Sequence, residues 1–235
     1  MADTARFLTA DWRDLAMLNY EIDPAVLAPR VPAGCELDAW RGRTFVSMVG
    51  FRFLRTRVLG VPVPFHVNFE EVNLRFYVRH KSGSEWRRGV VFVKELVPRR
   101  AIAWVARVAY GENYEAMPMR HSLSPSTVSY EWKPRGDWEG LSLRFAGEGV
   151  TPADDAEETF ITEHYWGYAR QRDGGSVEYK VEHPRWKVWR ASQAELRCDT
   201  EKLYGLEFAR VLEAKPTTAF VADGSPVIVR RGRRL

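Results

Sequence analysis

A chain of 235 residues has room for one large domain or at most two small ones. Its hydrophobic fraction of 45% and its many aromatic residues exclude a largely disordered chain, and its formal net charge is only +4. We interpret the basic tail at residues 230–234 as a solvated terminus. The sequence contains no signal-peptide core and no apolar run long enough to cross a bilayer. Two cysteines without a C-x-x-C motif favour a cytoplasmic protein with reduced thiols.

The first part of the chain predicts two strands separated by a short helix. Residues 15–22 and 44–54 are the predicted strands. Asp23 can cap a helix over residues 25–31, because its carboxylate can accept from free backbone amides and the following proline suits a first helical turn. Residues 61–64 predict an extended connector, since proline cannot donate to a β ladder.

Hairpins follow, each with a turn signal between its strands. The predicted strand pairs are 69–78 with 90–96, 127–133 with 141–145, and 160–170 with 177–183. Residues 151–158 predict a surface loop or one helical turn. Residues 199–212 have helical spacing, although Gly205 interrupts it. Two short strands, 218–221 and 226–229, end the series around a turn.

These elements number about ten strands and two or three helices, without the alternation of strand and helix that a doubly wound parallel sheet requires. No linker divides the chain. We therefore predict a single domain over residues 1–235 of the α+β class, mainly β. In it an antiparallel or mixed sheet curls into a barrel with helices packed at its edge.

The most informative segment is the predicted strand over residues 68–78, which alternates between polar and apolar side chains. Because successive side chains of a strand face opposite sides, Glu71, Asn73, Arg75 and Tyr77 share one face. A carboxylate, an amide, a guanidinium and a phenol in register suit the lining of a polar pocket inside a small barrel. The pattern is also typical of an ordinary solvated sheet face, and both interpretations stay open.

Several strings along nearly the whole chain carry a family resemblance: TADWRDLAMLNYEIDPAVLAPRVPAGCELDAWRGRTFVSMVGF, HVNFEEVNLRFYV, RRGVVFVKELVPR, ARVAYGENYEAMPM and EHYWGY. On these strings the chain resembles the YqjF-like family of uncharacterised bacterial proteins. It resembles the acetoacetate decarboxylase-like superfamily more distantly. The family brings no assigned activity, whereas the superfamily resemblance implies a β-barrel core with a funnel-shaped pocket and a few peripheral helices.

The resemblance also implies a chemistry for which this chain lacks the residue. The decarboxylase forms a Schiff base through a lysine whose pKa is lowered by burial and by a neighbouring lysine. Here Tyr114 and Glu115 stand where those lysines would be, and no lysine lies between Lys94 and Lys133. Schiff-base decarboxylation by the family's route is therefore not expected. A relocated amine at Lys94, which alternation places on the strand face of Phe92, is one alternative; a lysine that reaches solvent is the other.

Three arginines are candidate ligand-binding residues. In the resemblance Arg13 matches an arginine near the substrate carboxylate, and Arg107 matches the arginine of a Gly-Arg-Glu segment. Together with Arg75 they suit an anionic ligand, because guanidinium groups bind carboxylates in bidentate fashion. Ion pairing with Glu71 or Glu115, which would hold barrel elements together, is the alternative.

A second candidate group is mainly aromatic and consists of Tyr110, Tyr114, His164, Trp166 and Tyr168. The last three share one face of a predicted strand. An aromatic wall with an imidazole suits a small organic ligand, and a histidine can move protons near neutral pH. Core packing of the aromatic rings and a hydrogen-bonded core histidine explain the same pattern.

We predict no metal site and no cofactor. His164 and His183, each next to a glutamate, lack the spacing of a helical metal motif. The sequence contains no nucleophile-elbow, phosphate-loop or dinucleotide motif. The string HPRWKVWR at residues 183–190 combines aromatic and basic residues that suit single-stranded nucleic acid, but its alternation favours an amphipathic strand.

These observations predict a barrel protein that binds a small anionic organic molecule and that has no nucleic-acid or membrane partner. As an enzyme it would perform lyase- or hydrolase-like acid–base chemistry. Arg75 and Arg107 would position an acid group, and Glu71, Tyr114 or His164 would move protons. A non-catalytic sensor or carrier and an interaction module are the alternatives, and a homo-oligomer stays open.

Overall fold

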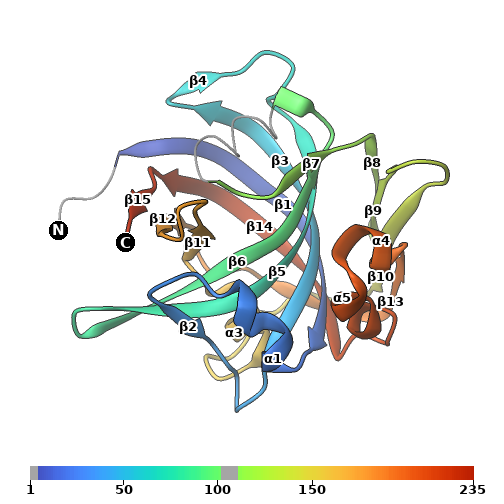
Figure 1. Cartoon of the computed structure of the whole chain (residues 1–235). Coiled ribbons are helices and arrows are strands. Elements are labelled where there is room, and N and C mark those ends of the chain that lie inside the picture. The colour runs from blue at the N-terminus through green and yellow to red at the C-terminus, as the bar shows by residue number, and fades with distance from the viewer. Residues whose placement is uncertain (1–4, 102–110) are drawn as a thin grey trace.

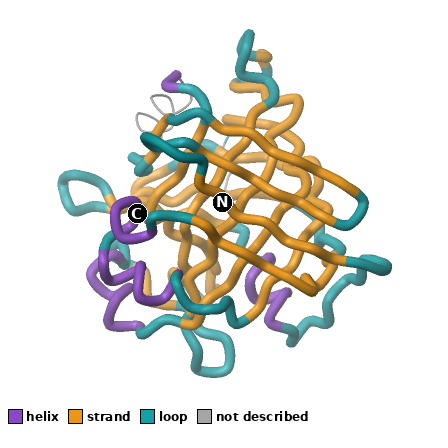
Figure 2. The backbone as a smooth tube through the Cα atoms, turned by 90° about the vertical axis from the view of Figure 1, so that its right-hand side faces the viewer, coloured by secondary structure: helices purple, strands orange, loops and turns teal. Residues whose placement is uncertain are grey.

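The computed structural model describes residues 5–101 and 111–235 and is built around a sheet that closes on itself (Figures 1 and 2). In the described chain, seven strands form the ring in the order β12 (Ser176–Glu182), β11 (Trp166–Arg170), β6 (Glu85–Val97), β5 (Phe69–Ser82), β3 (Phe45–Val58), β1 (Arg6–Glu21) and β14 (Thr218–Arg230). Pairing of β12 with β14 closes it. Neighbours are antiparallel except β11 and β6, which are parallel.

A second group of strands continues from β14 and packs outside the ring (Figure 1). It consists of β13 (Val188–Arg197), β10 (Glu139–Phe145), β9 (Thr127–Trp132) and β8 (Met119–Ser124). Beside it lie α4 (Thr200–Tyr204) and α5 (Leu206–Leu212). The smaller elements are α1 (Pro24–Leu27), a 3-10 turn (Ala28–Arg30), α3 (Glu157–Thr162), β2 (Cys35–Leu37), β4 (Val61–Pro62), β7 (Tyr114–Ala116) and β15 (Arg233–Arg234).

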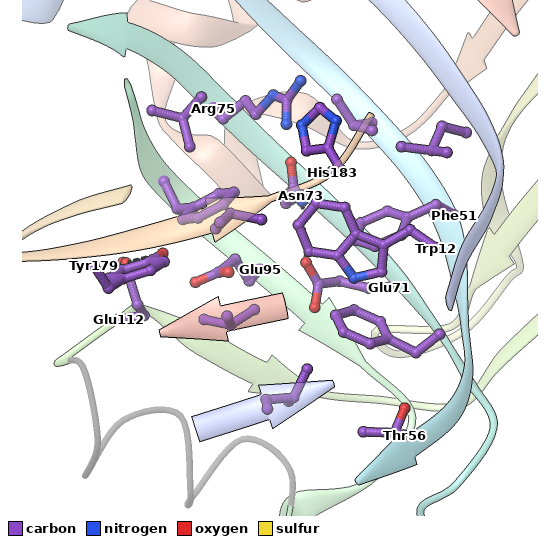
Figure 3. A pocket seen from close by; sticks show the side chains of 18 of the residues that line it. Trp12, Phe51, Thr56, Glu71, Asn73, Arg75, Glu95, Glu112, Tyr179 and His183 are labelled. Atoms are coloured by element: carbon purple, nitrogen blue, oxygen red, sulfur yellow. Dashed lines mark hydrogen bonds between the residues drawn. The ribbon is translucent and has the colours of Figure 1, made fainter. Parts of the chain in front are cut away.

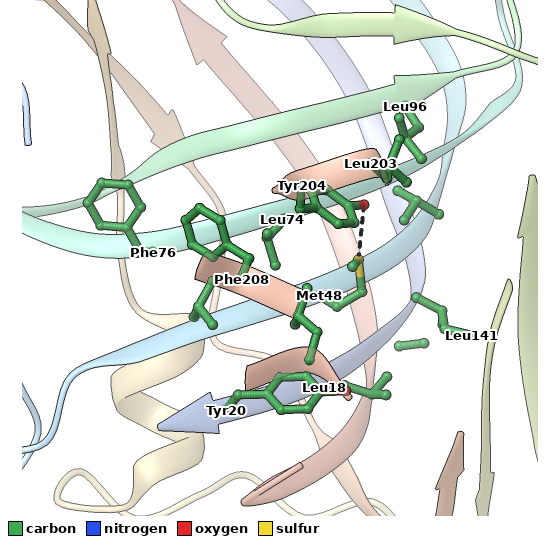
Figure 4. Close-up of a cluster of buried hydrophobic side chains, with 14 of the residues drawn as sticks. Leu18, Tyr20, Met48, Leu74, Phe76, Leu96, Leu141, Leu203, Tyr204 and Phe208 are labelled. Atoms are coloured by element: carbon green, nitrogen blue, oxygen red, sulfur yellow. Dashed lines mark hydrogen bonds between the residues drawn. The ribbon is translucent and has the colours of Figure 1, made fainter. Parts of the chain in front are cut away.

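The long ring strands are buried on both faces, and alternation assigns each face to a different core. Leu18, Met48 and Leu74 point outward and pack against side chains such as Tyr204 and Phe208 of the two short helices (Figure 4). The opposite face of the same strands forms a second cluster inside the ring. The ring interior is therefore separate from the main hydrophobic core.

Gly50 allows the outer strands to approach the ring closely. A Cβ at this position would lie 2.6 Å from the ring of Tyr130, well inside van der Waals contact. The phenol of Tyr130 reaches across and donates to the backbone oxygen of Asp14 at 2.8 Å. Glycine is thus required at Gly50 by the close packing of an aromatic side chain against β3.

Most predicted elements are present, and the differences have local causes. Residues 160–162 belong to α3 and not to a strand, so the predicted strand 160–170 was wrong in its first part. The predicted final hairpin was also wrong: β14 is continuous, because it pairs with β1 along its whole length. The predicted helix over residues 199–212 is two short helices that meet at Gly205, whose φ is 95°.

None of the described helices is long and apolar enough to span a membrane.

Replacing Asp23 with alanine is expected to lower the free energy of unfolding by about 1 kcal/mol, the usual cost of losing an N-cap. The Asp23 carboxylate accepts from the backbone amide of Ala25 at 2.8 Å and begins the helix that buries Leu27. Urea denaturation followed by circular dichroism measures the change. Asp23→Asn retains an acceptor and should lose much less; an equal loss in both variants would contradict the capping role.

Candidate functional site

A cavity of about 190 Å³ lies inside the ring (Figure 3). The inward side chains of β5 that line it are Phe69, Glu71, Asn73 and Arg75. Glu71 is only 3% exposed and Asn73 only 1%. The polar face of this strand therefore faces the interior, and the alternative of a solvated sheet face was wrong.

The neighbouring strands place other groups beside these residues through their register. Phe51 of β3 lies opposite Glu71, and Glu95 of β6 lies opposite Asn73. The short strand β7 pairs in parallel with β6, and this pairing places Tyr114 beside Glu95. Glu112 also lines the cavity. Segments distant in sequence thus bring three buried carboxyl groups to one wall.

Two phenols and one amide donate hydrogen bonds to two of these carboxyl groups, Glu71 and Glu112. The amide of Asn73 donates to Glu71 at 3.0 Å, and the phenol of Tyr114 donates to the other oxygen of Glu71 at 3.2 Å. Tyr179 donates to Glu112 at 3.0 Å. Oε2 of Glu95 is buried without a hydrogen-bond partner in the described part of the chain. That oxygen is available to a bound molecule.

Burial makes these carboxyl groups much weaker acids than usual. It raises the pKa of Glu71 to about 7, although hydrogen bonds from Asn73 and Tyr114 and the charge of Arg75 act in the opposite direction. It raises the pKa of Glu112 to about 8. The pKa of Glu95 rises well above its usual range because of burial and the two nearby carboxyls. Near neutral pH the cluster therefore retains most of its protons.

Arg75 lies at one end of the cavity. Its Nη2 donates to the backbone oxygen of Ile161 in α3 at 3.3 Å, and its buried Nε has no hydrogen-bond partner among the described residues. The exposed residues Val63 and Ala101 also line the cavity. Figure 3 places Arg75 and Thr56 at opposite ends. Among the described residues, the exposed Val63 lies with Thr56 beside the β3–β4 turn, which we call the open end, whereas Arg75 is bonded to α3 at the other end, which we call the closed end.

His164 lines the cavity from the connection between α3 and β11. Its Nε2 lies 3.1 Å from the carboxylate of Asp38, which also accepts from Arg88 at 2.6 Å. Burial lowers the pKa of His164 to about 4, so the imidazole is neutral near pH 7. Its Nδ1 is buried without a partner in the described chain. With Nε2 donating to Asp38, Nδ1 is a hydrogen-bond acceptor.

The structure brings together some of the sequence-predicted candidates. Those that line the cavity are Glu71, Arg75, Tyr114, His164 and Trp166. Arg13 does not line it and donates to the backbone oxygen of Gly224 at 3.0 Å. Tyr168 packs in the outer core with its phenol on the backbone oxygen of Arg87. Arg107 and Tyr110 lie outside the described residues. We therefore leave Arg13 and Tyr168 out of the proposed site.

Sequence reasoning missed Glu95, and a β-bulge explains why. Leu74 pairs with Lys94 but Arg75 pairs with Phe92, so β6 contains one extra residue at this point. A bulge of this kind reverses the alternation of side chains. Phe92 and Glu95 consequently both line the cavity, whereas Lys94 points elsewhere and pairs with Glu115 at 3.1 Å. The placement of Lys94 on the face of Phe92 was therefore wrong.

Glu112 and Tyr179 were also missed. The first follows a glycine at which no regular strand was predicted, and the second lies on a short strand without a distinctive pattern. Glu112 and Tyr179 are brought together only by the long-range strand pairing of the ring. No group of three or more His, Cys, Asp or Glu side chains in residues 5–101 and 111–235 is arranged to hold a metal ion.

Solved structures identify the fold. Acetoacetate decarboxylase from Legionella pneumophila superposes with a TM-score of 0.71 at 14% identity, covering 98% of this chain and 88% of the other. An acetoacetate decarboxylase-like enzyme from Sphingomonas wittichii RW1 has a TM-score of 0.69 at 15% identity, with 98% and 94% covered. The enduracididine biosynthesis enzyme MppR complexed with pyruvate has a TM-score of 0.68 at 12% identity, with 100% and 91% covered. The predicted mainly β fold of the acetoacetate decarboxylase type is confirmed.

The family itself follows from the sequence. The model of DUF2071, described as "Uncharacterized conserved protein (COG2071)", matches residues 9–226. The chain therefore belongs to this family. Its relative "Uncharacterized protein YqjF" from Bacillus subtilis (strain 168) is 27% identical over 193 residues, which cover 80% of this chain and 77% of the relative. The resemblance to the YqjF-like family is confirmed.

Proposed function

We propose that the cavity binds a small carboxylic acid and that its carboxyl cluster performs acid–base chemistry on it. The observation that carries this proposal is the charge of the cavity. The pKa values of Glu71 and Glu112 are raised to about 7 and about 8, so near pH 7 about half of Glu71 and most of Glu112 are neutral. Arg75 is the one arginine among the described lining residues, and its Nε lacks a partner. A cavity with this charge favours an anion.

The residues have distinct parts in this proposal. The guanidinium of Arg75 binds the carboxylate of the ligand. Glu71, with a pKa of about 7, accepts or donates a proton near neutral pH, where general acid–base groups are most effective. Tyr114 stays a phenol, because burial and the nearby glutamates raise its pKa, and it can donate a hydrogen bond. The neutral His164 accepts one at Nδ1.

The lining favours lyase- or hydrolase-like acid–base chemistry over an amine nucleophile. No lysine is among the described residues that line the cavity, and residues 102–110 contain none in the sequence. The fold neighbour MppR, one structure of which is complexed with pyruvate, supports a small keto acid as the ligand. We therefore propose keto acids of this size as the first compounds to test.

Affinity for such an acid is expected to fall about tenfold between pH 6 and pH 8. Raising the pH through about 7 ionises Glu71, whose pKa shift includes the charge of Arg75, and the new negative charge opposes an anionic ligand. Isothermal titration calorimetry with pyruvate and acetoacetate measures the effect. Glu71→Gln should flatten the pH dependence, whereas Glu131→Gln, which alters a carboxyl outside the lining, should not. Binding that strengthens with pH would refute the proposal.

A non-catalytic carrier or sensor is the second candidate, because no nucleophilic amine lines the described cavity. Proton NMR of pyruvate and acetoacetate incubated with the protein distinguishes the two. Consumption of the acid, or solvent deuterium exchange at the carbon next to its keto group, identifies an enzyme if it is faster than in the absence of protein and is abolished by Glu71→Gln. Tight binding with neither change identifies a carrier.

A further inference from the structure

The inward side chains of β5 line the cavity in sequence from its open end to its closed end. They run from Phe69 through Glu71 and Asn73 to Arg75. A strand advances about 3.3 Å per residue, so Phe69 and Arg75 lie roughly 20 Å apart along β5. Only the closed end has an unpartnered guanidinium nitrogen among the described lining residues. The cavity is therefore much longer than a pyruvate-sized acid held at Arg75.

Beyond the carboxyl cluster, the lining toward the open end is mainly apolar. Phe53 pairs with Phe69 across β3 and β5, and their rings stack with centroids 4.6 Å apart. Trp12 of β1 contacts Phe53 edge-on at 5.8 Å. Leu8 and Val58, which are paired in register, line the cavity as well. A polar closed end and an aromatic, aliphatic open end together match a molecule with a head and a tail.

We propose that the ligand is an amphipathic monocarboxylic acid, with its carboxylate at Arg75 and an alkyl or aryl tail that extends along the aromatic wall toward the open end. The position of the carboxylate rests on the proposed function. The inference that the ligand has an apolar tail rests on the independent observation of the apolar lining. Each buried methylene adds a roughly constant hydrophobic contribution, so affinity should rise about fourfold per methylene.

A homologous series tests the tail. Calorimetry at pH 6.5 with butanoate, hexanoate and octanoate is expected to show affinity that rises roughly 250-fold from the first to the last. Short acids that bind as tightly as long ones would overturn the inference and leave the proposed function standing. Octan-1-amine that binds as tightly as octanoate would overturn the place of the carboxylate at Arg75. Failure of every acid to bind would overturn both.

A charge at the open end provides a second test. Val63 lines the cavity and is 38% exposed, so Val63→Glu is compatible with folding. This variant is expected to lower the ratio of hexadecanoate to butanoate affinity about tenfold, because an acid of that length held at Arg75 reaches the mouth, where its tail would desolvate the new carboxylate. Val150, another exposed valine, does not line the cavity, and Val150→Glu is the matched control. Equal ratios in the two variants would contradict the proposed path of the tail.

Discussion

Replacing Arg75 with methionine is expected to weaken the binding of a carboxylic acid roughly 30- to 1,000-fold, or by about 2–4 kcal/mol. Arg75 is the one arginine among the described residues that line the cavity, and its unpartnered Nε is buried. Methionine retains an unbranched apolar stem of comparable length, so the loss reports the guanidinium. Calorimetry with pyruvate at pH 6.5 measures it, and thermal unfolding verifies that the variant is folded.

Two control variants distinguish the effect of the guanidinium group on binding from the effect of a positive charge at the same position and from the effect of an arginine elsewhere. Arg75→Lys keeps a positive charge but loses the planar fork, and it should bind with intermediate affinity. Arg190→Met removes an arginine whose side chain is 82% exposed and which pairs with Glu158 outside the cavity, and it should bind like the unmodified protein. Unchanged affinity in Arg75→Met would exclude the cavity as an anion site.

Raising the pH from 6.5 to 8.5 is expected to lower the free energy of unfolding by on the order of 3 kcal/mol. The pKa values of Glu71 and Glu112 are about 7 and about 8 in the folded protein, far above the value near 4.5 of an unfolded chain. The folded state therefore holds protons that the unfolded state has already released. The stability from these neutral carboxyls is lost as the pH rises through their folded pKa values.

The pH range from 6.5 to 8.5 avoids the ionisation of His164, which would change the stability in the opposite direction. Burial lowers the pKa of His164 to about 4, so its effect on stability is confined to the region below about pH 6.5. Calorimetric unfolding should show a decrease in Tm of roughly 6–12 °C between pH 6.5 and 8.5. Glu112→Gln should reduce that decrease and raise Tm at pH 8.5. Glu131→Gln, which removes a carboxyl whose pKa is lowered by Arg120, should leave the decrease intact.

The sequence was sufficient where a local pattern determines the structure. Alternation along residues 68–78 predicted a two-faced strand, and the turn signals predicted its hairpin with β6. Asp23 caps the short helix α1, as the hydrogen-bonding capacity of its carboxylate predicts. Alternation also grouped Glu71 with Arg75 before their surroundings were known. Alternation could not predict whether this polar face lines a cavity or faces solvent, because the answer depends on which strands lie opposite.

The rest of the site depends on long-range pairing and on one irregularity. Within the ring, β1 pairs with β14 and β6 pairs with β11, and both pairings join segments far apart in the chain. Those pairings bring Tyr179 and Glu112 together, and no local pattern specifies them. Tyr168 shows the converse: its spacing from Trp166 suggested the site, yet its side chain fills the outer core. Strand alternation alone could not locate the bulge in β6.

The bulge in β6 determines whether the interior contains an acid or an amine. Lys94 and Glu95 are adjacent, and the extra residue turns the glutamate inward and the lysine outward. The same strand without the bulge would present Lys94 to the cavity. In this chain a single backbone irregularity thus decides which of two adjacent residues of opposite charge faces the cavity. Exchanging the two residues, Lys94→Glu with Glu95→Lys, provides a direct route to an amine-bearing cavity on this scaffold.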